Sequence, residues 1–99
     1  MIEHIIIFKW KSNIPDEEKQ DILTSLLSLK NTIEGILELR VGHNFSTRSK
    51  GYDGGLVVTF ADQKSLDDYG PHPLHQEVAK RLNAAIDDLL ALDFKPIMD

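Results

Sequence analysis

The run of nine residues from Ile2 to Trp10 constrains the fold more than any other part of the chain. Nearly all of its residues are apolar or β-favouring, which predicts a strand. Alternate side chains of a strand point to opposite faces of a sheet. The two sets are Ile2, His4, Ile6, Phe8 and Trp10 on one face, and Glu3, Ile5, Ile7 and Lys9 on the other. Both sets carry aliphatic residues in the middle, so the strand is expected to be buried on both sides.

Two later stretches have the spacing of amphipathic helices. The first is predicted from Pro15 to Thr32, because proline suits a first helical turn and acidic residues follow at its positive end. The second is predicted from Pro73 to Ala91. The apolar stripes are Ile22, Leu26, Leu29 and Ile33 in the first helix, and Val78, Ala79, Leu82, Ala85, Ile86, Leu89 and Leu90 in the second.

Alternation of apolar and polar residues predicts three more strands: residues 37–45, residues 55–60 and residues 92–98. Pro96 interrupts the last strand, so it is expected at an edge of the sheet. Asp62 is a suitable N-cap for a short helix that ends at Tyr69. The order β-α-β-β-α-β over residues 1–99 predicts one α+β domain with a ferredoxin-like fold and a four-stranded antiparallel sheet.

Two helices can cover only one face of such a sheet. The first predicted strand is apolar on both faces, so the second face also needs a cover. The chain has no spare element to provide one. A second copy packed sheet to sheet would cover it, which predicts a homodimer.

Composition excludes several classes of function. With 11 basic and 16 acidic residues and a net charge of −5, the chain has no basic field for nucleic acid or anionic lipid. It contains no cysteine, which excludes disulfides and thiolate chemistry. No apolar run approaches the ~20 residues that a membrane span needs, and no secretory signal is evident. A cytoplasmic location is therefore expected, with neither nucleic acid nor membrane as a partner.

The segment from Asp67 to Val78 contains the strongest candidates for chemistry. His75 heads the apolar stripe of the second long helix, where an imidazole can act as a general base or simply fill the core. Tyr69 precedes it across a Gly-Pro turn, and a phenol can donate a hydrogen bond to a carbonyl or enolate oxygen. It can equally pack its ring on the sheet. Together at one chain break, the two residues predict a small-molecule pocket.

His4 and His72 are weaker candidates. His4 lines an interior cavity if its face of the strand points away from the helices, and otherwise fills an ordinary sheet position. His72 and His75 have HxxH spacing, but Pro73 places His72 before the regular helix. With no cysteine and no evident third ligand, no metal site is predicted.

The chain also resembles the stress-responsive A/B barrel domain family, whose members are dimeric α/β barrels. The resemblance covers nearly the whole sequence, and its most specific part is the Tyr-x-x-His-Pro-x-His segment. The matching motifs are His4-Ile5-Ile6-Ile7-Phe8-Lys9-Trp10, Gly35, Val41-Gly42-x-Asn44-x-Ser46, Gly51-Tyr52-Asp53, Val58-Thr59-Phe60, Tyr69-x-x-His72-Pro73-x-His75 and Asp93-Phe94.

The resemblance implies a ferredoxin-like protomer in a dimeric barrel. In a polyketide-cyclase branch of the family, which catalyses an aldol condensation, the matching tyrosine and second histidine are catalytic. These correspond to Tyr69 and His75, and the pocket-lining histidine corresponds to His4. In that branch an aromatic residue of the first helix lines the pocket at the position of Leu26. The leucine in this chain is a departure that bears on which substrate is bound and which reaction is catalysed.

We therefore expect an apolar barrel pocket that binds a small carbonyl or phenolic molecule. Its predicted catalytic residues are His75 as base and Tyr69 as oxygen partner. The residues expected to bind the substrate are His4, Ile6, Phe8, Val58 and His72. This chemistry needs no cofactor. The alternative is a non-catalytic stress-response or ligand-binding protein in which the same residues are structural; a cofactor-free oxygenase is a third class.

Overall fold

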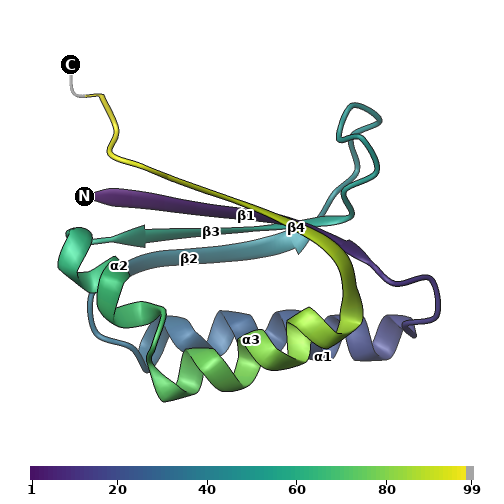
Figure 1. The fold of residues 1–99 in the computed structure, drawn as a ribbon, viewed down its shortest axis with the longest axis horizontal. Coiled ribbons are helices and arrows are strands. Elements are labelled where there is room, and N and C mark those ends of the chain that lie inside the picture. Colours follow the sequence, from purple (N-terminus) through teal and green to yellow (C-terminus); the bar gives the residue numbers. More distant parts are fainter. Residues whose placement is uncertain (98–99) are drawn as a thin grey trace.

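The computed structural model describes residues 1–97 as a single antiparallel sheet with all helices on one face (Figure 1). The strand order is β2-β3-β1-β4, so β2 and β4 are the edges. In chain order the elements are β1 (Ile2–Trp10), α1 (Asp16–Ser28), the 3-10 turn η1 (Leu29–Asn31), β2 (Ile36–His43), β3 (Gly54–Phe60), α2 (Gln63–Tyr69), α3 (Pro73–Ala85) and β4 (Ile86–Phe94). The ferredoxin-like fold with an antiparallel four-stranded sheet is confirmed.

The core lies between the sheet and the helices. The even-numbered side chains of β1 point into it, with Phe8 fully buried. Val58 lies opposite His4 in the register of β3 and is also fully buried. Ile22 and the buried leucines of α1 and η1 close the helix side of this core, which is the contribution that their 3.6-residue spacing predicted.

The predicted end of the second long helix is wrong. Helix α3 ends at Ala85, and Ile86 already has extended backbone angles of φ −120° and ψ 154°. The segment predicted as the last two helical turns is instead the first two thirds of β4. Strand β4 pairs with β1 along nearly its whole length, with Leu89 opposite Phe8 and Leu92 opposite Ile5. Pairing with a strand some 80 residues earlier in the chain overrides the local helical pattern.

The second predicted strand is also too long at its end. Strand β2 stops at His43, and Phe45 lies in the following loop with 98% of its surface exposed. The alternation of residues 37–45 therefore does not continue to Phe45, because Asn44 begins a set of local turn hydrogen bonds. Its side-chain oxygen accepts from the Ser46 amide at 3.0 Å, as in an Asx turn.

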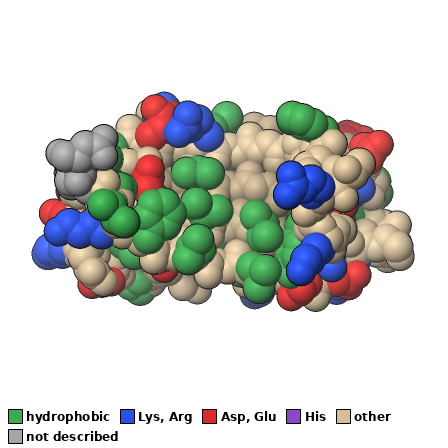
Figure 2. Space-filling view, turned by 90° about the horizontal axis from the view of Figure 1, so that it is seen from above, with side chains coloured by type: hydrophobic (Ala, Val, Ile, Leu, Met, Phe, Trp, Pro, Cys, Tyr) green, Lys and Arg blue, Asp and Glu red, His purple; other side chains and the backbone are tan. Residues whose placement is uncertain are grey.

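The face of the sheet away from the helices has no cover from the chain itself. Figure 2 looks onto this face and shows hydrophobic side chains gathered over the sheet. They include Leu90, 52% exposed, and Leu92, 59% exposed, both on β4. Ile5 and Ile7 of β1 lie beside them in register. Among residues 1–97, no helix has both the length and the apolar character required of a membrane span.

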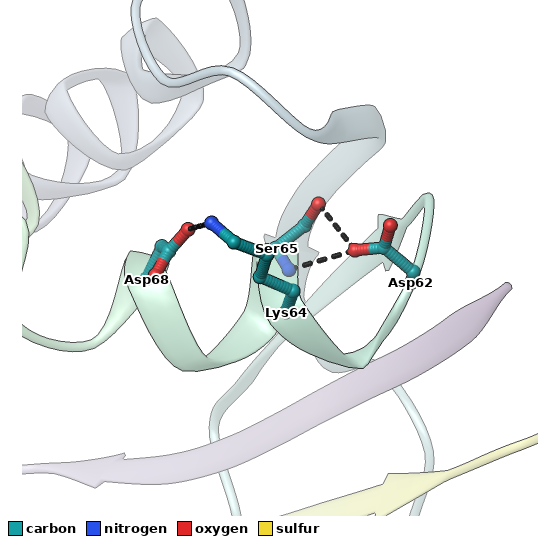
Figure 3. A network of polar contacts seen from close by, with 4 residues as sticks. All are labelled: Asp62, Lys64, Ser65 and Asp68. Atoms are coloured by element: carbon teal, nitrogen blue, oxygen red, sulfur yellow. Dashed lines mark hydrogen bonds and ion pairs between the residues drawn. The ribbon is translucent and has the colours of Figure 1, made fainter.

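Helix α2 begins where the sequence predicts. The Asp62 carboxylate accepts hydrogen bonds from the amide and the hydroxyl of Ser65, both at 2.8 Å, and Lys64 pairs with Asp68 one turn further on (Figure 3). The first bond satisfies one of the unpaired amides at the helix start. This cap fixes the start of a short helix whose last residue is Tyr69.

Candidate functional site

The turn between α2 and α3 brings the predicted residues of the second half of the chain together. The His72 amide donates to the Tyr69 carbonyl at 3.2 Å, which closes the turn. His72 then caps α3, because its Nδ1 accepts a hydrogen bond from the Leu74 amide at 3.1 Å. Pro73 occupies the first turn of α3, where its missing amide hydrogen costs nothing. His72 thus has a defined role in starting the helix that carries His75.

Tyr69 points inward from the end of α2 and is only 2% exposed. Its ring meets Phe60 edge-on at a centroid distance of 5.0 Å and His4 at 6.0 Å. Its hydroxyl is buried and has no hydrogen-bond partner among the described residues. Burial raises the pKa of the phenol to about 12, so the hydroxyl remains a hydrogen-bond donor at neutral pH.

His75 lies against Tyr69, with ring centroids 4.1 Å apart. Its Nδ1 is 2.9 Å from the carbonyl oxygen of Gly70. A carbonyl can only accept, so Nδ1 carries the hydrogen and Nε2 is the basic nitrogen of the neutral ring. Burial lowers the pKa of His75 below 6.5, with the Gly70 hydrogen bond opposing and the two neighbouring histidines, His4 and His72, adding to the effect. The imidazole is therefore neutral at pH 7.

His4 comes from the opposite end of the chain and completes the cluster. It is buried on β1, and its Nδ1 bonds the Asp93 carboxylate of β4. The two residues are direct cross-strand partners in the sheet. Sequence reasoning did not identify Asp93 as the partner of His4. Its motif position beside Phe94 was visible, but the register of β4 that sets it opposite His4 was not.

The structure corrects the expected location of the pocket. The face of β1 that carries His4, Ile6 and Phe8 points toward the helices, not into a space between two sheets. Phe8 and Val58 are fully buried core residues, and Ile6 is partly buried against the same core. A strand that is apolar on both faces does not reveal which face the helices will cover. The large aromatic side chains on the even-numbered face fill the helix side.

The rings of Tyr69, His75 and His4 form an apolar corner that carries a few polar atoms. Its available groups are the Tyr69 hydroxyl, the His75 Nε2 and the His4 ring held by Asp93. The Tyr69 hydroxyl has no surface open to solvent, so a ligand reaches it only when the neighbouring side chains move. Among residues 1–97, no group of three or more His, Asp or Glu side chains is arranged to hold a metal ion.

The chain is similar in sequence and in fold to several known proteins of about the same length. It is 26% identical to olivetolic acid cyclase of Cannabis sativa over 96% of this chain and 96% of that protein. Its fold matches the Arabidopsis thaliana protein At3g17210 with a TM-score of 0.91 and 24% identity, covering 100% and 98% of the two chains. It also matches a Jannaschia protein described as dimeric and ferredoxin-like, with a TM-score of 0.84, 26% identity and coverage of 96% and 98%.

The family assignment rests on a match along almost the entire chain. The family model described as Stress responsive A/B Barrel Domain matches residues 2–96. This range includes all four strands and the His4, Tyr69 and His75 cluster. The chain therefore belongs to the stress responsive A/B barrel domain (Dabb) family.

Proposed function

We propose that this protein is a homodimer whose protomers each bind a small, apolar carbonyl or phenolic molecule at the corner formed by Tyr69, His75 and His4. The uncovered apolar face of the sheet supports the dimer, since a patch of this kind on a small domain marks an interaction surface. The Jannaschia protein of the same fold, described as dimeric, supports it as well.

One observation carries the ligand site: the Tyr69 hydroxyl is buried without a partner directly beside the His75 ring. Leaving a buried hydroxyl unpaired costs about 1–3 kcal/mol. A ligand oxygen that accepted its hydrogen bond would recover that free energy. The apolar surroundings from Phe60 favour a ligand that is otherwise hydrophobic.

The proposed reaction is proton transfer at a carbon next to a carbonyl group. His75 Nε2 removes the proton, because the Gly70 carbonyl fixes the hydrogen on Nδ1 and the lowered pKa keeps the ring neutral. Tyr69 donates its hydrogen bond to the carbonyl oxygen and stabilises the enolate that forms. His4, oriented by Asp93, supports the position of the ligand. An aldol cyclisation would begin with the same step.

A second function, ligand binding without catalysis, is favoured by the closure of the site. The Tyr69 hydroxyl has no solvent-exposed surface, and Leu26 is packed in the core at 3% exposure. In that case Tyr69 and His75 shape a binding corner, and no bond in the ligand is broken.

Solvent deuterium exchange distinguishes the two functions. The homodimer in D₂O is mixed with an aryl β-diketone such as benzoylacetone, and loss of the proton between the carbonyls is followed by NMR. Catalysis predicts faster exchange with the wild type than with His75→Gln or Tyr69→Phe, whereas His43→Gln, on the exposed end of β2, matches the wild type. Equal rates in all four proteins with saturable binding would support the non-catalytic function. If the wild type shows neither faster exchange nor binding, the proposed ligand class is contradicted.

A further inference from the structure

A hollow of about 410 Å³ lies at the end of the sheet where a loop, residues 44–53, joins β2 to β3. Its floor belongs to the face away from the helices. Gly42 and Gly55 are direct cross-strand partners there, and Gly55 also pairs with Ile7, an odd-numbered residue of β1. The two glycines leave the backbone of the floor bare, and a Cβ added at Gly42 would meet no atom within 4 Å.

The loop supplies a wall of the hollow, and polar contacts hold this wall in place. Tyr52 and Ser49 of the loop line the hollow. The Tyr52 hydroxyl donates to the Asp88 carboxylate of β4 at 2.7 Å, and Lys9 Nζ lies over the Tyr52 ring, 4.6 Å from its centroid. The Ser49 hydroxyl accepts from the Asn44 side chain at 3.0 Å. A site whose walls are ordered before binding loses little conformational entropy when a ligand enters.

The lining of the hollow includes a cationic side chain and no acidic one among residues 1–97. Arg40 lines it, although the chain as a whole carries 16 acidic and only 11 basic residues. Arg40 forms no ion pair with a described residue, and the nearby carboxylate of Glu38 is paired with Lys30 at 2.9 Å instead. The guanidinium is therefore available to a carboxylate, whose two oxygens match its planar fork of donors.

The floor of the hollow favours a flat ligand. Two glycines side by side present peptide groups without side chains, so a planar ring can approach the backbone closely. The apolar side chains of Ile7 and Val57 flank this floor. Arg40 lies two residues before Gly42 on the same face of β2, next to Val57 in register. A carboxyl group on a ring over the glycines would reach the guanidinium.

We propose that this hollow is a second ligand site, which binds a small planar aromatic carboxylate with its ring over Gly42 and Gly55 and its carboxylate paired with Arg40. The site lies on the opposite face of the sheet from Tyr69, which is part of the core on the helix side. It therefore does not depend on the function proposed for the Tyr69 corner.

A second copy of the chain is the competing occupant of the hollow, because the hollow lies on the uncovered face of the sheet. The unpaired guanidinium of Arg40 favours the carboxylate. Burying an unpaired charge under another protein costs free energy, whereas a carboxylate pairs with that charge.

Isothermal titration calorimetry of the wild type with 2-naphthoate tests the site. We expect saturable binding that is about 10-fold tighter than binding of the uncharged 2-naphthamide, because the carboxylate makes charge-assisted hydrogen bonds. Arg40→Gln should reduce the affinity for 2-naphthoate to that for the amide. Arg48→Gln is the matched control, since it removes the same charge from an exposed loop residue that does not line the hollow. Tyr69→Phe should leave the affinity for 2-naphthoate unchanged.

Gly42→Val tests the floor independently of charge. The added side chain enters open space on an extended strand, so the variant should keep its fold, checked by circular dichroism, and should lose 2-naphthoate binding. Sedimentation equilibrium on the same variants should show the oligomeric state of the wild type.

Three results would overturn the proposal, and they differ. If the wild type does not bind 2-naphthoate, or if Arg40→Gln and Gly42→Val bind it as the wild type does, the hollow is not a carboxylate site. If binding is lost in Tyr69→Phe alone, the ligand occupies the Tyr69 corner, and the function proposed there gains support. If 2-naphthoate binds to none of the proteins and Gly42→Val changes the oligomeric state, the hollow is occupied by a second copy of the chain.

Discussion

The imidazole of His75 lies 4.1 Å from the phenol ring of Tyr69, centroid to centroid, with the two planes inclined by 43°. The residues are separated by the Gly-Pro turn, and they come from different helices, α2 and α3. The turn also supplies the Gly70 carbonyl that fixes the hydrogen on His75 Nδ1. One short segment therefore provides a neutral base, a hydrogen-bond donor and the group that orients the base.

Replacing Tyr69 by Phe is expected to stabilise the ligand-free protein while it abolishes ligand binding. The variant removes a buried hydroxyl that has no partner and keeps the ring contacts with Phe60 and His4. We expect the free energy of unfolding to rise by about 1 kcal/mol, measured by urea denaturation. A fall of similar size would mean that the hydroxyl has a hydrogen-bond partner in the folded protein.

The lowered pKa of His75 predicts a loss of stability on acidification. Burial is the main cause of the shift below 6.5. As the pH falls below 6.5, the unfolded chain takes up a proton at this position before the folded protein does, so protonation favours unfolding. The stability contribution is present above pH 6.5 and is lost as the pH falls through the folded pKa.

Thermal unfolding between pH 7.5 and pH 5 measures this effect. Over this range the Tm of the wild type should fall further than the Tm of His75→Gln. The control His43→Gln changes an exposed histidine at the end of β2 and should keep the wild-type slope. Parallel slopes for the wild type and His75→Gln would show that His75 titrates alike in the folded and unfolded states.

The sequence predicted β1, α2 and the N-terminus of α3 because local signals decide them. The β-favouring run Ile2–Trp10 predicts a strand, Asp62 caps α2, and Pro73 starts α3. The boundary between α3 and β4 was missed because Ile86 to Leu90 satisfies a helical stripe as well as a strand. Its state is decided by pairing with β1, at the other end of the chain.

The cluster of site residues was predicted in part, and its surroundings were not. The helical wheel indicated that His75 faces inward, and it does lie against Tyr69. The face on which they meet depends on which side of β1 the helices cover, and the apolar residues on both sides left that undecided. Asp93 was missed as the partner of His4 for the same reason as the start of β4, because pairing with β1 decides both.

Gly35 is expected to be intolerant of a side chain. Its φ of +91° is strained for other residues, and an added Cβ would lie 2.4 Å from the Ser65 Oγ. Gly35→Ala should lower the free energy of unfolding by about 2 kcal/mol or more and should disturb the Asp62–Ser65 cap of α2. Gly70→Ala is the control, because Gly70 has a helical φ of −52° and no atom within 4 Å of an added Cβ. It should be neutral or slightly stabilising, and equal losses in both variants would contradict the role of backbone conformation at Gly35.

Removing the carboxylate of Asp93 is expected to release the His4 ring. In the wild type, Nδ1 of His4 bonds Asp93, so the hydrogen of the neutral ring lies on Nδ1. Asp93→Ala should lower the free energy of unfolding by about 1 kcal/mol, a modest value because the carboxylate is half exposed. The ¹⁵N shifts of His4 should change from the Nδ1–H tautomer to a mixture. Asp87→Ala, which removes an exposed carboxylate near the other end of β4, should change neither quantity. If the His4 tautomer is the same in Asp93→Ala as in the wild type, the hydrogen bond to Asp93 does not set the position of the hydrogen on the ring.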